Sequence, residues 1–353
     1  MKRPSLLRGA AAALASLTLA GGAAHAAEFG NITINGYGNQ SFIRTTDNAW
    51  LGADSSGSFK DNVFALVVTA KLDERSKIWS QLASISGSSI DVHWFYVDRT
   101  FGDQLTLRAG KVLAPLGFYN EYIDARFLQQ STILPLLYQP DTDLVDEAYG
   151  GLGGTWSTSL GGGKVDVDLY GGQIVEHAAV AALQKQKGLI GARIDWRTPI
   201  DGLRLMLSAS TKKQLTIGDP DDTTKTSMIV SAGYDVGPLE LKAEFGHIKN
   251  SMGGTDSTTS VGYLQAGYSL TDNWIPFARY DMLRAPGYDS ADASTYQNTL
   301  ALGITYRVNA NLAFRLENHF NTGYGAAALS GETAAGQGQK TWQMLAASVA
   351  FIF

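Results

Sequence analysis

The side chains most able to do chemistry in this sequence are charged and lie outside any catalytic spacing. The set has two acids and six arginines: Glu121, Asp124, Arg108, Arg126, Arg193, Arg204, Arg279 and Arg315. Without a nucleophile beside them, such charges act through their electric field, and rings of charge at a constriction set which ions pass. If the chain forms a channel, these residues are the candidates for its lining and its narrowest part, with Arg108 facing Glu121 or Asp124.

Catalytic and metal-binding patterns are missing from the sequence. No nucleophile elbow occurs, the chain has no Cys, and Gly161 to Lys164 lack the spacing of a phosphate-binding loop. Four histidines remain beyond residue 26, scattered over different segments: His93, His177, His247 and His319. We expect no enzyme activity, no cofactor and no metal site. Calcium binding by the acidic stretches 141–147 and 219–222 stays open.

The charges lie on segments in which every second residue is apolar. In the segment 312–317, one face is apolar and the other carries Arg315 and Glu317. The same rhythm runs through three further segments, 190–197, 239–245 and 300–306. A period of two predicts half-buried β-strands, and a slip of one residue would turn arginines into lipid.

Turns and polar connections divide the chain into strands of similar length. Seven short turns are expected at 73–77, 101–104, 160–164, 198–202, 235–238, 270–273 and 307–311. Eight longer connections are expected near 45–60, 86–91, 117–147, 175–187, 214–225, 249–258, 284–295 and 321–340. Seven and eight connections join sixteen strands, an even number, as in single-chain bacterial barrels.

Aromatic residues recur on the apolar face beside the short turns. They are Trp196, Tyr234, Tyr268 and Tyr306, with Phe351 and Phe353 at the same expected height. Aromatic rings at one level form a girdle at a membrane interface. The fold of a soluble β-sandwich does not require such regular placement. The predicted fold is an all-β, transmembrane, antiparallel up-and-down β-barrel of sixteen strands. A wall this wide leaves an aqueous lumen that side chains do not fill.

The N-terminus has the three parts of a secretory signal peptide. Lys2, Arg3 and Arg8 precede an Ala/Leu run and small residues that end at Ala26. We expect residues 1–26 to be removed, which leaves residues 27–353 as a barrel exported through the periplasm. Loss of the three charges takes the formal net charge from -5 to -8, and this argues against nucleic acid as a partner.

The third long connection, 117–147, is the longest. It holds six acids against one base, Arg126, and an apolar stretch at 133–137. Such a stretch is costly to leave in water, and a loop of this length in a compact fold is usually functional. We expect this third loop to fold into the lumen. The alternative is an external loop whose charges keep it soluble.

The layout resembles that of Gram-negative outer-membrane porins, the general-diffusion and phosphate-selective channels. The resemblance rests on the sixteen-strand pattern, the terminal Phe353, and the runs Leu107 to Lys111 and Pro115 to Glu121, which lead into the long third loop. It implies passive diffusion of small hydrophilic solutes and ions, an outer-membrane location among lipid, and a homotrimer. The acidic, Gly-rich loop tip and the lysine cluster of those families are absent, so the preferred solute is not predicted.

Other functions remain open at this point. The barrel could be an adhesion or binding protein with a blocked lumen, or a channel specific for sugars or organic anions. Aromatic residues expected on the inner face, Tyr170, Trp94 and Tyr96, would favour sugars. A lipid hydrolase would need its residues outside, whereas Ser208 and His319 are expected inside. The inner charges could also form plain wall ion pairs: Arg193 with Asp195, Arg279 with Asp281, and Arg315 with Glu317.

Overall fold

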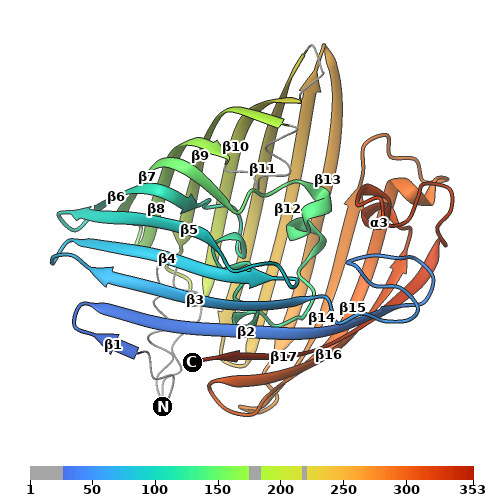
Figure 1. Cartoon of the computed structure of the whole chain (residues 1–353), viewed down its shortest axis with the longest axis horizontal. Helices are drawn as coiled ribbons and strands as arrows, with labels where there is room; N and C mark the ends of the chain where they lie inside the picture. Colours follow the sequence, from blue (N-terminus) through green and yellow to red (C-terminus); the bar gives the residue numbers. More distant parts are fainter. Residues whose placement is uncertain (1–26, 175–183, 217–220) are drawn as a thin grey trace.

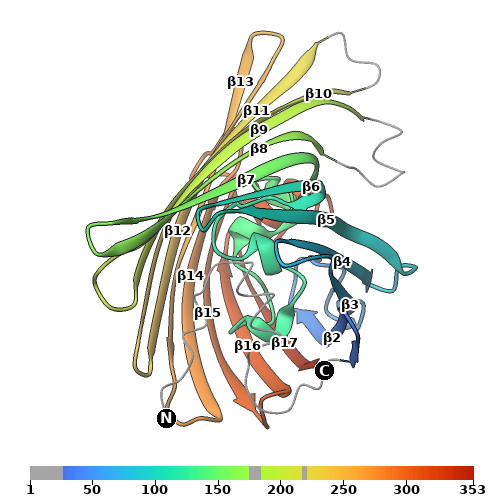
Figure 2. The same cartoon turned by 90° about the vertical axis from the view of Figure 1, so that its left-hand side faces the viewer.

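The computed structural model of the chain describes residues 27–174, 184–216 and 221–353. The expected signal peptide, His177 and part of the acidic stretch 219–222 lie outside these residues. The described residues form one antiparallel sheet that curls into a closed ring (Figure 1, Figure 2). Each strand pairs with the next one along the chain, so the wall is an up-and-down barrel.

Sixteen of the seventeen described strands close the ring. The extra strand, β1 (Ala27–Phe29), is short and pairs with the start of β2. The ring consists of β2 (Ile32–Thr45), β3 (Asn62–Lys71), β4 (Ser76–Ile85), β5 (Asp91–Phe101), β6 (Leu105–Leu113), β7 (Ala148–Leu160), β8 (Gly163–Ile174), β9 (Gln184–Arg197), β10 (Leu203–Thr216), β11 (Asp222–Val236), β12 (Leu239–Met252), β13 (Thr255–Tyr268), β14 (Trp274–Arg284), β15 (Tyr296–Arg307), β16 (Leu312–Thr322) and β17 (Thr341–Ile352). The predicted barrel of sixteen strands is confirmed.

The seam that closes the ring joins β2 to β17. Their register runs from Thr45 opposite Met344 to Tyr37 opposite Ile352. Beyond it, Gly36 and Phe353 exchange two backbone hydrogen bonds of 2.8 Å. Gly36 has no Cβ, and a Cβ there would lie 2.2 Å from the Phe353 ring, so glycine leaves the space that the ring fills. The closed seam pairs the first strand of the ring with the last, so neither is left with an unpaired edge along this ladder.

One predicted connection is wrong. The polar residues of 249–258 predict a long loop, but β12 runs to Met252 and β13 starts at Thr255, leaving Gly253 and Gly254 as a two-residue turn. Both glycines have positive φ, which suits a tight hairpin. Lys249 and Asp256 pair across the hairpin at 2.7 Å, so polar residues extend the ladder. This hairpin projects beyond the rest of the wall (Figure 1).

The two faces of the wall differ as the alternation predicts. On β16, Phe314 and Leu316 are 47% and 52% exposed on the outer face, whereas Arg315 and Glu317 are buried on the inner face. An apolar outer face suits contact with lipid. The rings of Trp274 and Tyr306 pack together beside the short turns, with centroids 4.5 Å apart, where an aromatic girdle is expected.

Helices are few and short. Among the described residues, no helix has the length and hydrophobicity needed to cross a lipid bilayer. Four one-turn helices lie in the connection between β6 and β7: η1 (Asn120–Tyr122), η2 (Arg126–Leu128), η3 (Leu136–Tyr138) and η4 (Pro140–Thr142). Two more, η5 (Ala293–Thr295) and α3 (Gly325–Leu329), lie on either side of β15 and β16. We call residues 114–147 the long connection.

Candidate functional site

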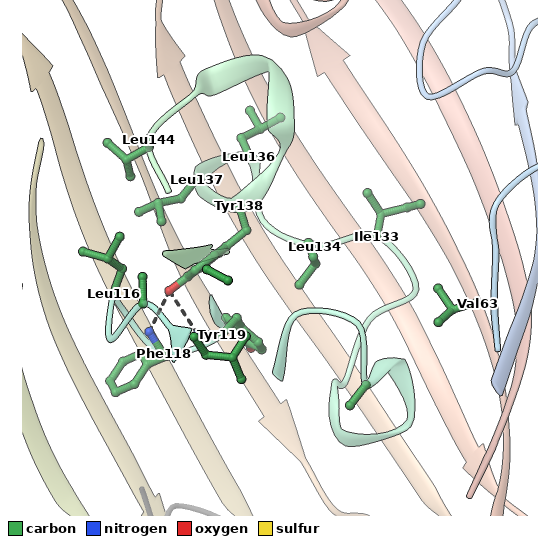
Figure 3. Packing of buried hydrophobic residues seen from close by; sticks show 14 of the residues in the cluster. Val63, Leu116, Phe118, Tyr119, Ile133, Leu134, Leu136, Leu137, Tyr138 and Leu144 are labelled. Atoms are coloured by element: carbon green, nitrogen blue, oxygen red, sulfur yellow. Dashed lines mark hydrogen bonds between the residues drawn. The ribbon is translucent and has the colours of Figure 1, made fainter. Parts of the chain in front are cut away.

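The apolar part of the long connection packs against the inner face of the wall. Ile133, Leu134, Leu136 and Leu137 are buried, and Figure 3 shows them in front of the strands. The helix η3 contacts β12, β13 and β14. Gly246 of β12 makes room for this packing, because a Cβ there would lie 2.5 Å from Leu144. Each buried leucine contributes about 1.5 to 3 kcal/mol.

Two carboxylates of the wall bind backbone N–H groups of the long connection. Glu317 of β16 accepts from the N–H groups of Thr132 and Ile133, at 2.9 and 2.8 Å. Asp281 of β14 accepts from the N–H group of Leu136 at 3.0 Å. Because both carboxylates are buried, these charge-assisted bonds fix the apolar stretch at one height on the wall.

Two arginines of the wall bind backbone carbonyls of the same stretch. Arg279 donates to the carbonyls of Ile133 and Leu134, and also to Asp281 at 2.7 Å. Arg315 donates to the carbonyls at 127 and 129, at 3.0 and 2.7 Å. The wall therefore supplies both acids and bases to a stretch whose own side chains are mostly uncharged.

The start of the long connection is fixed by a third wall carboxylate. Glu244 of β12 accepts from the Phe118 N–H group at 2.9 Å and from the Tyr138 hydroxyl at 2.5 Å. The Tyr138 hydroxyl also accepts from the N–H groups of Phe118 and Tyr119 (Figure 3). Burial, with the Glu244 carboxylate second, holds the pKa of Tyr138 well above its usual value. The hydroxyl therefore stays protonated and can serve as a donor.

A charged network lies at η1, where the long connection supplies the acid. Glu121 accepts from Arg193 of β9 at 2.5 Å, and Arg193 donates to Asp168 of β8 at 2.8 Å. Arg108 of β6 lies 4.0 Å from Asp168 and donates to Thr155 at 2.7 Å. The side chains of Arg108 and Glu121 are 20% and 16% exposed, and both line one small cavity of about 20 Å³.

A second group of charges lies near the end of the long connection. Lys212 of β10 donates to Asp146 at 2.5 Å, and Lys225 of β11 pairs with Asp143. Asp143 has a positive φ of 51°, a conformation that Asp tolerates better than most residues. The acidic stretch 141–147 thus meets lysines of the wall.

Arg204 of β10 takes the place expected for Arg193 beside Asp195. It binds Asp195 of β9 through two parallel hydrogen bonds of 2.8 and 2.7 Å and lies over the Phe118 ring. The wall pair expected between Arg193 and Asp195 is therefore replaced, since Arg193 pairs with Asp168 and Glu121. Of the three wall pairs weighed from the sequence, that of Arg279 with Asp281 is a direct contact in the structure.

Asp124 and Arg126 lie apart from Arg108. Asp124 accepts from Gln81 of β4 at 2.8 Å and lies 3.7 Å from His93 of β5. Arg126 begins η2 and is half-buried. Of the two acids expected opposite Arg108, only Glu121 shares its cavity. His93 was not predicted here, because a β-bulge between Gln81 and Leu82 shifts the strand register and turns it inward.

The inner aromatic residues are covered. Trp94, Tyr96 and Tyr170 are all buried on the inner face, as expected. Their rings pack on one another and on neighbours. The ring centroids of Trp94 and Tyr96 lie 5.9 Å apart, and those of Tyr170 and Tyr149 lie 5.0 Å apart. They present little surface to a passing sugar. Ser208 and His319 lie beneath the long connection, bonded to the Gly117 N–H group and to Glu317.

Comparison with solved structures agrees on the architecture. The anion-selective porin from Comamonas acidovorans has a TM-score of 0.64 at 13% identity, over 91% of this chain and 99% of that one. OmpF of Salmonella typhi, in complex with daunomycin, has a TM-score of 0.63 at 13% identity, over 93% of this chain and 100% of that one. The chain has the fold of the porins.

The outer-membrane protein OmpT of Vibrio cholerae is similar too. One structure of it has a TM-score of 0.61 at 11% identity, over 93% of this chain and 100% of that one. A trimer form of the same protein has a TM-score of 0.60 at 9% identity, over 91% of this chain and 99% of that one. At these identities the likeness concerns the fold. No family model matches the chain, and no curated protein matches its sequence.

Proposed function

We propose that this protein is an outer-membrane porin. It forms a water-filled channel through which small hydrophilic solutes and ions diffuse passively, without catalysis. The observation that carries the proposal is the closed sixteen-strand wall, apolar outside and charged inside, with a long connection bound to its inner face. A wall of this width is too large for its own side chains to fill.

In this proposal the long connection narrows the lumen. Its hydrogen bonds to β12, β14 and β16 hold it away from the external solvent. Arg108 and Glu121 keep partial exposure, line one cavity, and supply an electric field there. Of the five other arginines among the predicted lining residues, Arg193, Arg204, Arg279 and Arg315 act mainly by holding the wall and the long connection, and Arg126 lies on the long connection itself.

We also propose a homotrimer in the outer membrane, exported through the periplasm. The fold likeness includes a trimer form of the Vibrio cholerae protein. The apolar outer face of the barrel is the surface that contacts lipid or a neighbouring subunit. Cross-linking of the purified protein, followed by mass determination, measures the number of subunits.

Single-channel recording in planar bilayers tests the channel. We expect stepwise conductance increases on insertion and a measurable reversal potential in a salt gradient. A folded, heat-modifiable barrel that inserts without conductance steps would contradict the porin proposal and support a binding barrel with a blocked lumen. Swelling of liposomes in sugars then separates the two kinds of channel. In general diffusion the swelling rate falls smoothly as the sugar becomes larger. In a specific channel the transport rate of the preferred sugar saturates as its concentration rises.

A further inference from the structure

A cluster of ligand-type side chains lies where the long connection meets β4 and β5. It consists of His93, Asp124 and Glu147, whose ligand atoms all lie within 4.8 Å of one another. The three residues come from a strand of the wall, from the first half of the long connection and from its last residue. The channel proposed above does not need this cluster, and ion selectivity does not explain its histidine.

The local fold is unusual at His93. Gln81 of β4 pairs with Trp94, and Leu82 pairs with Val92, so His93 is the extra residue of a β-bulge. As a result both His93 and Trp94 are buried on the inner face. Bulges of this kind re-aim a side chain and are over-represented beside functional sites.

Asn120 is an independent sign that a ligand belongs there. It is 0% exposed and lines the same cavity as Asp124 and Glu147. Its amide nitrogen donates to the carbonyls of Ala114 and Asp146, at 2.8 and 2.9 Å, which fixes which end of the amide is oxygen. That oxygen has no hydrogen-bond partner among the described residues. Buried polar atoms rarely remain so.

The two carboxylates receive few hydrogen bonds. Oε1 of Glu147 is buried without a hydrogen-bond partner among the described residues, and Asp124 receives one hydrogen bond of 2.8 Å from Gln81. Two partly buried carboxylates whose oxygens lie within 4.8 Å of each other repel unless a proton or a cation lies between them. The cavity measures about 10 Å³, which suits one water-sized occupant.

We propose that His93, Asp124 and Glu147 bind one divalent cation of the first transition row, with the Asn120 amide oxygen as a further ligand. Imidazole nitrogen with carboxylate oxygens suits zinc or manganese, whereas calcium and magnesium prefer oxygen alone. Zinc to ligand distances of about 2.0 to 2.2 Å require a small inward rotation of these side chains. The ion joins β5 to both ends of the long connection.

Zinc titration of the folded, full-length barrel tests this site. The protein carries no polyhistidine tag, is treated with EDTA, and is then titrated with Zn²⁺ in detergent by calorimetry. We expect one equivalent in the wild type, and at least about tenfold weaker binding in His93→Gln and in Glu147→Gln, because even outer-shell changes cost 10 to 100-fold. Mn²⁺ should compete, and Mg²⁺ should compete far less.

The control is His247→Gln, since His247 lies on β12 with Ser260 at 2.9 Å and outside the cluster. This variant should bind zinc as the wild type does. Glu147→Gln keeps the side-chain volume and decides the test if His93→Gln fails to fold, as judged by heat-modifiable migration. Zinc should also raise the melting temperature of the wild type but not that of Glu147→Gln. Absence of a one-equivalent site, or equal affinity in all four proteins, overturns the proposal.

Discussion

Two segments of the long connection, 121–124 and 131–137, are held to the wall in opposite ways. In the first segment the connection supplies the charged side chains: Glu121 reaches Arg193, and Asp124 reaches Gln81. In the stretch 131–137 the connection supplies its backbone, and the charges come from Glu317 and Arg279 of the wall.

This difference shows that inner charges of a barrel can serve two purposes. The loop acids of the first segment, Glu121 and Asp124, keep 16% and 12% exposure. The wall charges beneath 131–137 are buried against peptide groups, where removal of one partner leaves the other desolvated and unpaired. The segment 131–137 should therefore depend more strongly on single residues than the segment 121–124. The following predictions test that comparison, from the largest expected effect to the smallest.

Glu317→Gln should destabilise the barrel most, by about 3 kcal/mol or more, because two buried backbone N–H groups and His319 lose a shared carboxylate. Glu121→Gln removes the same charge from the segment 121–124 and should cost about 1 kcal/mol or less, because Glu121 is partly exposed and Arg193 keeps its bond to Asp168. Urea unfolding in detergent measures both losses. Equal losses in the two variants would mean that the two segments are not held differently.

Gly117→Ala should cost about 1 to 3 kcal/mol, because Gly117 has φ of 59° and a Cβ there would lie 2.1 Å from the Tyr138 hydroxyl. Gly331→Ala is the matched control: its φ is 76° but nothing lies within 4 Å of the added methyl. The control should show the backbone strain alone, about 1 kcal/mol. Melting temperatures compare the two, and the Gly117 variant should also show altered single-channel conductance.

Arg108→Ala should raise the preference of the channel for cations. Arg108 is partly exposed, so the expected change in permeability ratio is roughly twofold, equivalent to about 0.5 kcal/mol. Reversal potentials in a salt gradient measure it. Lys249→Ala, in the projecting hairpin, should leave the potential unchanged. An unaltered potential in the Arg108 variant would remove this residue from the ion path.

Asp141→Asn should change the pH dependence of stability slightly. Burial, more than the neighbouring Glu332, raises the pKa of Asp141 above its usual value of 3.8 despite the hydrogen bond from Trp50. A raised carboxyl pKa stabilises the fold below the unfolded pKa, and this is lost as pH rises through the folded pKa. From pH 3 to 7 the wild type should therefore lose stability relative to the variant. A constant difference between their melting temperatures would contradict this.

The sequence predicts the wall well and the interior only in part. Strict alternation of apolar residues fixes the strands and their faces, because one slip would bury arginines in lipid. It also correctly predicts inward Arg279 and Arg315. It does not predict that these residues bind carbonyls, because peptide groups carry no sequence signal.

Three local features escape prediction for the same kind of reason. The turn at Gly253 and Gly254 is hidden by polar residues that look like a loop but pair across strands. The bulge at His93 depends on the pairing of β4 with β5, so periodicity alone misplaces its side chain. The acidic stretch 141–147 reads as solvated, yet Lys212 and Lys225 meet it from the wall.

The seam between β2 and β17 is expected to form late in folding. Tyr37 and Ile352 are roughly 300 residues apart in the chain, so their encounter carries a large loop-closure cost and forms slowly. Until they meet, two strand edges offer unpaired peptide groups to any other chain. Pairing of β2 with β17 therefore closes the barrel and removes the two strand edges at which another chain could add.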